Sequence, residues 1–204
     1  MDTDDHQHIF LFSPGNEKKV INVRATHIRR LFDILHVSLQ RGDSHRARHA
    51  WAILARCKEV DWKEKWRMSL RLLDSGATLQ SNSRKTEFLR TIMLQSPNQR
   101  EHILSELVIH LINAGKYRDA LDELELYLPS FPYHDNAPLH VYAGLICVYM
   151  AQPDDSGDQN TCFNGDMLGR AQIYFERAKS LDSDNLVAKT FLERVRVLQT
   201  RWSR

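Results

Sequence analysis

Residues 107–132, which read LVIHLINAGKYRDALDELELYLPSFP, decide the fold of this chain. Apolar residues at helical spacing fill the first half, and Gly115 follows as a residue that can end a helix. Ala120, five residues later, is small enough to let a second helix approach the first, and Leu124 then fills the space between them. Pro132 cannot continue that second helix. The stretch therefore predicts two packed helices joined by a tight turn.

The same spacing occurs in two other places. One copy consists of Gly42, Ala47, Trp51 and Leu54, and another keeps Ala171, Phe175 and Ala178 without a well-placed glycine. This pattern is typical of tetratricopeptide repeats, which stack helix pairs into solenoids that bind other macromolecules. The aligned alanines are 73 and 51 residues apart, and neither separation is a multiple of the period of about 34 residues. We therefore expect an all-α, tetratricopeptide-like helical repeat: a short, degenerate and interrupted α-solenoid.

Two stretches are expected to lie outside the helices. Residues 1–25 contain a Ser-Pro-Gly-Asn run and are predicted to form a flexible N-terminal arm. Residues 26–204 are predicted to form the helical repeat domain. Within it, a segment at about residues 152–166 is rich in Asp, Gly and Asn, and it is predicted to be a polar insertion between the two helices of the third repeat.

One further helix is expected outside the repeat pattern. Asp61 is followed three residues later by Glu64, which is an N-terminal capping pattern. One helical face then continues to Gly76 through Trp62, Trp66, Leu70 and Leu73. No convincing alternating strand pattern occurs after residue 25, so the prediction stays all-α.

Composition narrows the classes of protein. Of the 204 residues, 42% are hydrophobic and 26% are charged, as is usual for a soluble globular protein. No run approaches the roughly 18 consecutive apolar residues of a membrane span, so no membrane contact is expected. The acidic start of the chain is unlike a secretory signal, which predicts an intracellular protein. Cys57, Cys147 and Cys162 are an odd number without close spacing, which argues against a disulfide framework.

Catalytic and metal-binding patterns are scarce. His45 and His49 stand one helical turn apart and could present two imidazoles to a metal ion, but no glutamate follows His45 and no third ligand is evident. Neither the dinucleotide-binding glycine pattern nor a phosphate-binding Gly-Lys-Ser/Thr loop occurs. We expect no enzyme, no cofactor, no metal and no small-molecule substrate. A metal-dependent enzyme at the two histidines is kept as a third alternative, and a metal-free preparation that retains fold and function would exclude it.

Charge is distributed unevenly along the chain. Residues 24–71 hold twelve Lys or Arg against five Asp or Glu, a net charge of +7, and residues 101–135 have a net charge of −5. Arg41, Arg46 and Arg48 cluster at the turn of the first repeat, and we predict them as contacts with DNA or another polyanion. The alternative interpretation is an ordinary solvated helical face.

A more particular pattern surrounds the first repeat. An Arg-Gly-Asp turn at residues 41–43 is followed by Ala-Arg-x-Ala-Trp at 47–51 and by Asp61-Trp62. Over about residues 27–75 this resembles the start of the tetratricopeptide-like subunit of the RNA polymerase I core promoter factor. The resemblance implies a scaffold subunit in transcription initiation at ribosomal RNA genes, located in the nucleus and nucleolus. It also implies TFIIB-like and propeller-containing partner subunits, recruitment of RNA polymerase I, and promoter DNA bound as part of the complex.

A generic tetratricopeptide protein-protein adaptor of a chaperone or degradation pathway is the alternative function. Adaptors of the chaperone type bind C-terminal carboxylates with a particular set of Lys and Asn residues across successive repeats. That set cannot be located in these degenerate copies. The two functions predict different co-purifying proteins.

Overall fold

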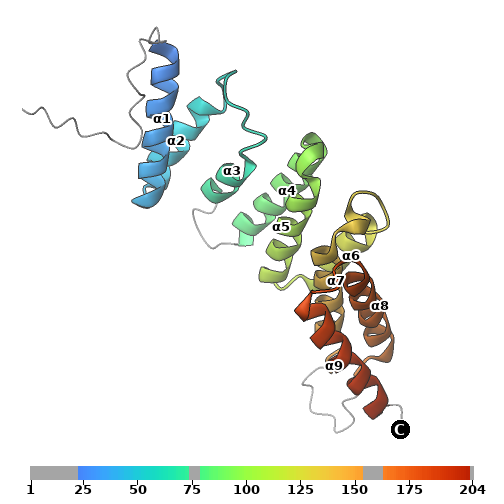
Figure 1. Cartoon of the computed structure of the whole chain (residues 1–204). Helices are drawn as coiled ribbons and strands as arrows, with labels where there is room; N and C mark the ends of the chain where they lie inside the picture. Colours follow the sequence, from blue (N-terminus) through green and yellow to red (C-terminus); the bar gives the residue numbers. More distant parts are fainter. Residues whose placement is uncertain (1–22, 74–78, 154–162, 203–204) are drawn as a thin grey trace, which may run out of the picture. The chain divides into compact units, whose positions relative to one another are not determined.

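The computed structural model describes residues 23–73, 79–153 and 163–202, and every regular element within these ranges is helical (Figure 1). The prediction of an all-α fold is confirmed. The chain divides into two compact units, Met1–Trp62 and Lys63–Arg204.

Two predicted segments fall largely on residues that the structure does not describe. They are the N-terminal arm at 1–25, of which only the last three residues are described, and the polar insertion at about 152–166. The arm, the insertion and the single repeat domain over 26–204 stay predictions. The first helix begins at Val23, three residues before the predicted start of the repeat domain.

The first unit is a helical hairpin of α1 (Val23–Gln40) and α2 (Ser44–Leu54). Gly42 makes the turn with a φ of 73°, a left-handed conformation that favours glycine. The Asp43 amide donates to the Ser38 carbonyl at 2.9 Å, and the Gly42 amide donates to the Leu39 carbonyl at 3.2 Å. These two bonds form the Schellman motif that closes a helix C-terminus.

Packing of the hairpin follows the repeat spacing. Ala47 is fully buried, so α2 approaches α1 closely, and the large Trp51 ring is buried one turn further along. The remaining buried residues of the two helices are Leu31, Leu35 and Ser38 on α1 and Ala50 and Leu54 on α2.

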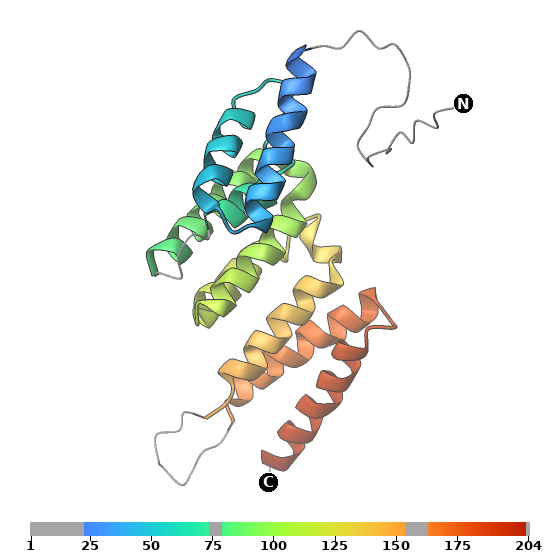
Figure 2. The same ribbon diagram turned by 90° about the vertical axis from the view of Figure 1, so that its left-hand side faces the viewer.

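The second unit contains α3 (Trp66–Leu72), α4 (Leu79–Gln95), α5 (Arg100–Asn113), α6 (Tyr117–Tyr127), α7 (Ala137–Met150), α8 (Gly165–Leu181) and α9 (Leu186–Trp202). Short 3-10 turns at Pro97–Gln99 and Tyr133–Asp135 precede α5 and α7. From α3 onwards each helix packs against the next along the chain, and α7, α8 and α9 lie side by side (Figure 2). The unit is thus a stack of sequential helices.

The central repeat is the pair α5 and α6. Gly115 has the same φ of 73° as Gly42, and the Lys116 amide donates to the Leu111 carbonyl at 2.9 Å, so the same type of turn ends both first helices. Ala120 and Leu124 are fully buried. Pro132 follows the end of α6 and immediately precedes the 3-10 turn.

The third repeat is the pair α7 and α8, in which Ala171, Phe175 and Ala178 are fully buried. The Asn136 side chain caps α7 by accepting from the Leu139 amide at 3.3 Å. The described part of this repeat has no turn glycine, but α7 contains Gly144 at its contact with α8.

The predicted start of the helix after residue 61 is wrong. α3 begins at Trp66, its N-cap is Lys65, and no side chain caps it. Lys63, Glu64 and Lys65 are exposed, so no buried side chain stabilises a helix before Trp66. Trp66 is 1% exposed, and its indole donates to Gln99 Oε1 at 2.6 Å. The first helical turn therefore forms where tertiary packing starts.

Candidate DNA-binding and partner-binding surfaces

The structure brings the three predicted polyanion contacts to one end of the first hairpin. Arg41 directly follows the last residue of α1, and Arg46 and Arg48 lie in the first turns of α2. All three side chains are exposed. The turn between the helices is held by Asp43, whose carboxylate accepts from the Arg46 amide at 3.0 Å, and Arg48 Nε donates to the Ser44 carbonyl at 3.1 Å.

The surface around these arginines is basic because α2 contains no acidic residue. Across residues 23–62 there are eight Lys or Arg against four Asp or Glu, a net charge of +4. Two of these four acids have structural roles: Asp43 caps α2, and Glu59 pairs with Arg24. That ion pair lowers the pKa of the Glu59 carboxyl through a hydrogen bond from the guanidinium. Such a surface can bind phosphate groups.

His45 and His49 also lie on α2. Their rings meet edge to face with centroids 4.6 Å apart. Among the described residues, no three His, Cys, Asp or Glu side chains come together in a way that could hold a metal ion.

Three of the seven acidic residues in the region 101–135 form ion pairs between elements of the second unit. Glu123 on α6 pairs with Arg90 on α4 at 2.6 Å, and Glu125 on α6 pairs with Arg170 on α8. Asp135 also pairs with Arg177 of α8, at 3.4 Å. The first two ion pairs connect α6 to α4 and to α8. The net charge of −5 therefore does not describe a free acidic surface.

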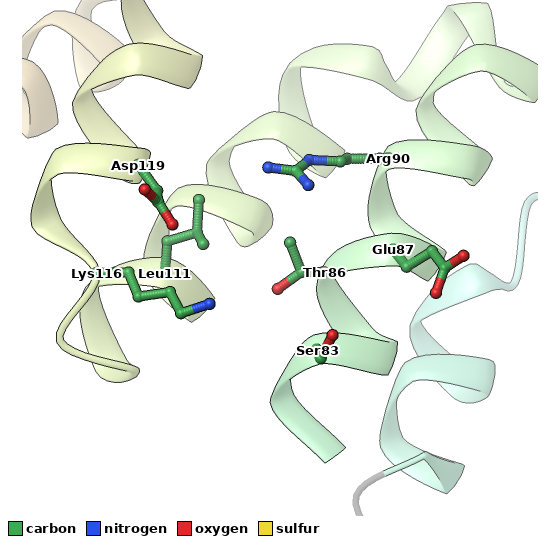
Figure 3. Close-up of a pocket in the computed structure, with 7 residues that line it drawn as sticks. All are labelled: Ser83, Thr86, Glu87, Arg90, Leu111, Lys116 and Asp119. Atoms are coloured by element: carbon green, nitrogen blue, oxygen red, sulfur yellow. The ribbon is translucent and has the colours of Figure 1, made fainter. Parts of the chain in front are cut away.

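A polar groove lies between α4 and the start of α6 (Figure 3). Its volume is about 260 Å³, and Leu111 of α5 lies between the two sides. Arg90 and Lys116 extend into the space from opposite sides, whereas the Glu87 carboxylate points away from it (Figure 3). The Thr86 hydroxyl on the α4 side donates to the Asn82 carbonyl at 3.0 Å. The groove can receive a polar group of a partner chain.

A second, more apolar groove of about 460 Å³ lies between α6 and α8. Leu128, Pro129 and Ile173 contribute apolar surface, and Ile173 is 66% exposed. His140 lines the inner side, where Nε2 donates to the His134 carbonyl at 3.0 Å. Burial lowers the pKa of the His140 ring, because the protonated form would lose its hydration. The neutral ring therefore forms part of an apolar wall.

No helix in the described ranges is long and apolar enough to cross a membrane.

Helix pairs with glycine turns and buried alanines on the second helix define a tetratricopeptide-like helical repeat protein. Solved structures of MamA share this fold. MamA 41-end from Desulfovibrio magneticus RS-1 is 18% identical with a TM-score of 0.52, covering 86% of this chain and 89% of the other. The MamA RS-1 ArsTM double mutant is 19% identical with a TM-score of 0.52, covering 83% of each chain.

The particular family follows from the sequence. Residues 7–103 match the family of the RNA polymerase I-specific transcription initiation factor Rrn11. The RNA polymerase I-specific transcription initiation factor rrn11 of Schizosaccharomyces pombe is 30% identical over 149 residues, which cover 68% of this chain and 72% of the relative. The chain therefore belongs to this family and acts in transcription initiation by RNA polymerase I. The predicted resemblance is confirmed.

Sequence reasoning identified the basic turn but not the grooves or the residues that connect the repeats. Arg90 and Glu123 are 33 residues apart, and neither belongs to a recognisable motif. Gly144 could have been noticed as a lone glycine in an otherwise apolar helix, a position that often marks close packing.

Proposed function

We propose that this chain is the scaffold subunit of the RNA polymerase I core promoter factor. In this proposal it holds a TFIIB-like subunit and a propeller-containing subunit together near upstream promoter DNA, and it helps to recruit RNA polymerase I to ribosomal RNA genes. It acts by stoichiometric binding without catalysis, and its place of action is the nucleus, in the nucleolus.

The second unit is suited to a scaffold. Its repeats are connected by ion pairs between α4, α6 and α8, which restrict sliding of one helix pair past the next. Large apolar side chains remain at its surface, with Leu126 68% and Phe131 84% exposed. Exposed apolar side chains beside grooves are favourable docking sites for partner chains. These features support contacts with other subunits.

The first unit is suited to DNA. Phosphate binding requires several cations close together, and the end of the hairpin presents Arg41, Arg46 and Arg48. The Asp43 carboxylate at the same turn accepts a hydrogen bond from the Arg46 amide. The spacing of these arginines carries no base-specific signal. We therefore assign Arg46 and Arg48, which lie on α2, to contacts with the phosphate backbone that position the factor on DNA.

The observation that carries the proposal is membership of an RNA polymerase I initiation factor family combined with a repeat fold. Its test is purification of the tagged chain from its native cells at moderate salt, followed by mass spectrometry. We expect near-stoichiometric recovery of a TFIIB-like subunit, a propeller-containing subunit and RNA polymerase I. Recovery of chaperones or degradation components instead would favour the generic adaptor. A tagged Ala120→Trp chain is the matched control, because a disrupted central repeat should lose the partners.

A further inference from the structure

One side of α1 carries a row of exposed residues separated alternately by four and three positions. The row consists of Val23, His27, Arg30, Ile34, Val37 and Arg41, and we call it the α1 stripe. Arg41 follows the last helical residue, but its amide still donates to the Val37 carbonyl at 3.0 Å, so it continues the row. Residues that are separated alternately by four and three positions lie along one face of a helix. Ile34 and Val37 are 45% and 42% exposed.

The central repeat shows what normally covers this face. Aligning Gly42 with Gly115 shifts the numbering by 73 residues, so Arg30 corresponds to Ile103 and Ile34 corresponds to Leu107. Both Ile103 and Leu107 are fully buried. Two positions of the stripe, those of Arg30 and Ile34, are therefore core positions one repeat later, whereas Val37 corresponds to the partly buried His110.

The helix that covers those positions in the central repeat is α4. α5 packs mainly against α4 and α6. The buried residues of α1, which pack in the hairpin with α2, are Leu31, Leu35 and Ser38. The shift of 73 residues relates them to Leu104, Val108 and Leu111 of α5, so these three face α6 in the central repeat. Ile103 and Leu107 are left to face α4. Within the first unit α1 packs against α2, and the place equivalent to α4 is not filled by any described helix of that unit.

The chemistry of the stripe differs from that of its buried counterpart. Arg30 stands where α5 has Ile103, and Arg41 stands where α5 has Ala114. No acidic residue occurs at any of the six positions. The apolar pair Ile34 and Val37 thus lies between two cationic residues, Arg30 and Arg41.

We infer that the α1 stripe binds an acidic amphipathic helix of a partner protein, in the position that α4 takes on α5. The apolar face of that helix packs on Ile34 and Val37, and carboxylates on either side of it pair with Arg30 and Arg41. Helix-in-groove docking of this type uses apolar anchors at helical spacing. Flanking charge pairs set the register and select the partner.

The spacing of the stripe residues along α1 determines the sequence pattern that we expect in the partner helix. Arg30 and Arg41 are eleven residues apart, or about 16 Å along the axis. A matching helix has an acidic residue, apolar residues four and seven positions later, and a second acidic residue eleven positions after the first. A second copy of this chain does not fit, because two-fold pairing of the stripe would place Arg30 opposite Arg41 of the other copy, and like charges repel.

The test places a photo-crosslinking benzoylphenylalanine at position 37 of the full chain in its native cells. The control carries it at position 53 on α2, where Ile53 is 48% exposed but does not belong to the stripe. The cross-linked peptides are sequenced by mass spectrometry. We expect position 37 to capture a segment of another protein with the acidic-apolar-acidic pattern. Capture of residues 1–22 of this chain, of a second copy or of a segment without the pattern would overturn the inference, as would a yield no higher than at position 53.

A charge-reversal variant tests the ion pairs separately. Arg30→Glu with Arg41→Glu should reduce cross-linking from position 37 by about tenfold, which corresponds to about 1.4 kcal/mol. Arg29→Glu with Arg56→Glu changes the same net charge outside the stripe and should have little effect. Equal losses in the two double variants would contradict the inference.

The inference rests on the proposed function only for the identity of the partner. If the captured acidic helix belongs to a protein unrelated to RNA polymerase I, the core-factor proposal fails while the stripe assignment stands. If the core-factor subunits co-purify but position 37 captures none of them, the stripe assignment fails alone.

Discussion

The ring of Phe175 on α8 lies directly against the backbone of Gly144 on α7. A Cβ atom at Gly144 would stand 2.7 Å from both Cε1 and Cζ of that ring, closer than real Cβ contacts allow. Phe175 cannot easily move away, because it is fully buried and stacks on Phe191 with ring centroids 5.8 Å apart. The close approach of α7 and α8 in the third repeat therefore depends on the absence of a side chain at Gly144.

Gly144→Ala should destabilise the second unit. Alanine favours a helix over glycine by about 1 kcal/mol, but overpacking against a fixed ring costs about 1–3 kcal/mol. We expect the free energy of unfolding to fall by about 1 kcal/mol, measured by urea denaturation. Gly169→Ala on α8 is the matched control, because a Cβ there meets nothing within 4 Å. That variant should be as stable as the wild type or more stable, and equal behaviour of both variants would refute the close contact.

Ala120→Trp should disrupt the central repeat. Ala120 is fully buried in α6, and the larger ring has no space between α6 and α5. The expected loss of stability is about 3 kcal/mol or more, visible as a lower melting temperature. Leu126→Trp places the same ring on the same helix, but Leu126 is 68% exposed, so its melting temperature should stay close to that of the wild type. A wild-type melting temperature for Ala120→Trp would contradict the repeat assignment.

Features that depend on neighbouring residues could be predicted from the sequence, whereas contacts between residues distant in the sequence could not. Gly42 and Gly115 act within their own turns, so their roles could be inferred from neighbouring residues. The contact of Gly144 with Phe175 joins two helices on either side of the predicted insertion, and no local pattern reports such a distant neighbour.

The same reasoning applies to the candidate sites. The cluster of Arg41, Arg46 and Arg48 was predictable because the three residues are close in sequence. The groove beside Arg90 and Lys116 exists only because α4 and α6 lie next to each other in the stack. The late start of α3 also follows from a tertiary bond, between Trp66 and Gln99. Local capping rules do not include such bonds.

Stability should depend on pH through His140. Burial is the main cause of its lowered pKa, nearby Arg177 lowers it further, and the hydrogen bond with the His134 carbonyl partly opposes them. Below about pH 6.5 the His140 ring therefore binds a proton in the unfolded chain, whereas in the folded chain it resists protonation. The free energy of unfolding should fall as the pH decreases from about 7 to about 5. His140→Gln should reduce that decrease, measured by urea unfolding at both pH values, and an identical pH dependence in the two proteins would contradict the assignment.

Reversing the charges of Arg46 and Arg48 should weaken DNA binding by the purified complex. Each lost phosphate contact reduces the slope of log affinity against log salt by about 0.9, so Arg46→Glu with Arg48→Glu should reduce it by about 2. The side chains are exposed, so the melting temperature should stay close to that of the wild type. Binding to a duplex from the upstream promoter is measured across a salt titration.

The control for this prediction separates a local contact from a change in total charge. Arg84→Glu with Arg194→Glu alters the net charge equally, at exposed positions of α4 and α9 in the second unit. Long-range attraction to DNA is screened beyond about 10 Å at moderate salt, so charges that make no phosphate contact should leave the slope nearly unchanged. If both double variants lose the same affinity for DNA, binding depends only on the overall charge of the protein. If neither loses affinity at any salt concentration, the hairpin end is an ordinary solvated surface.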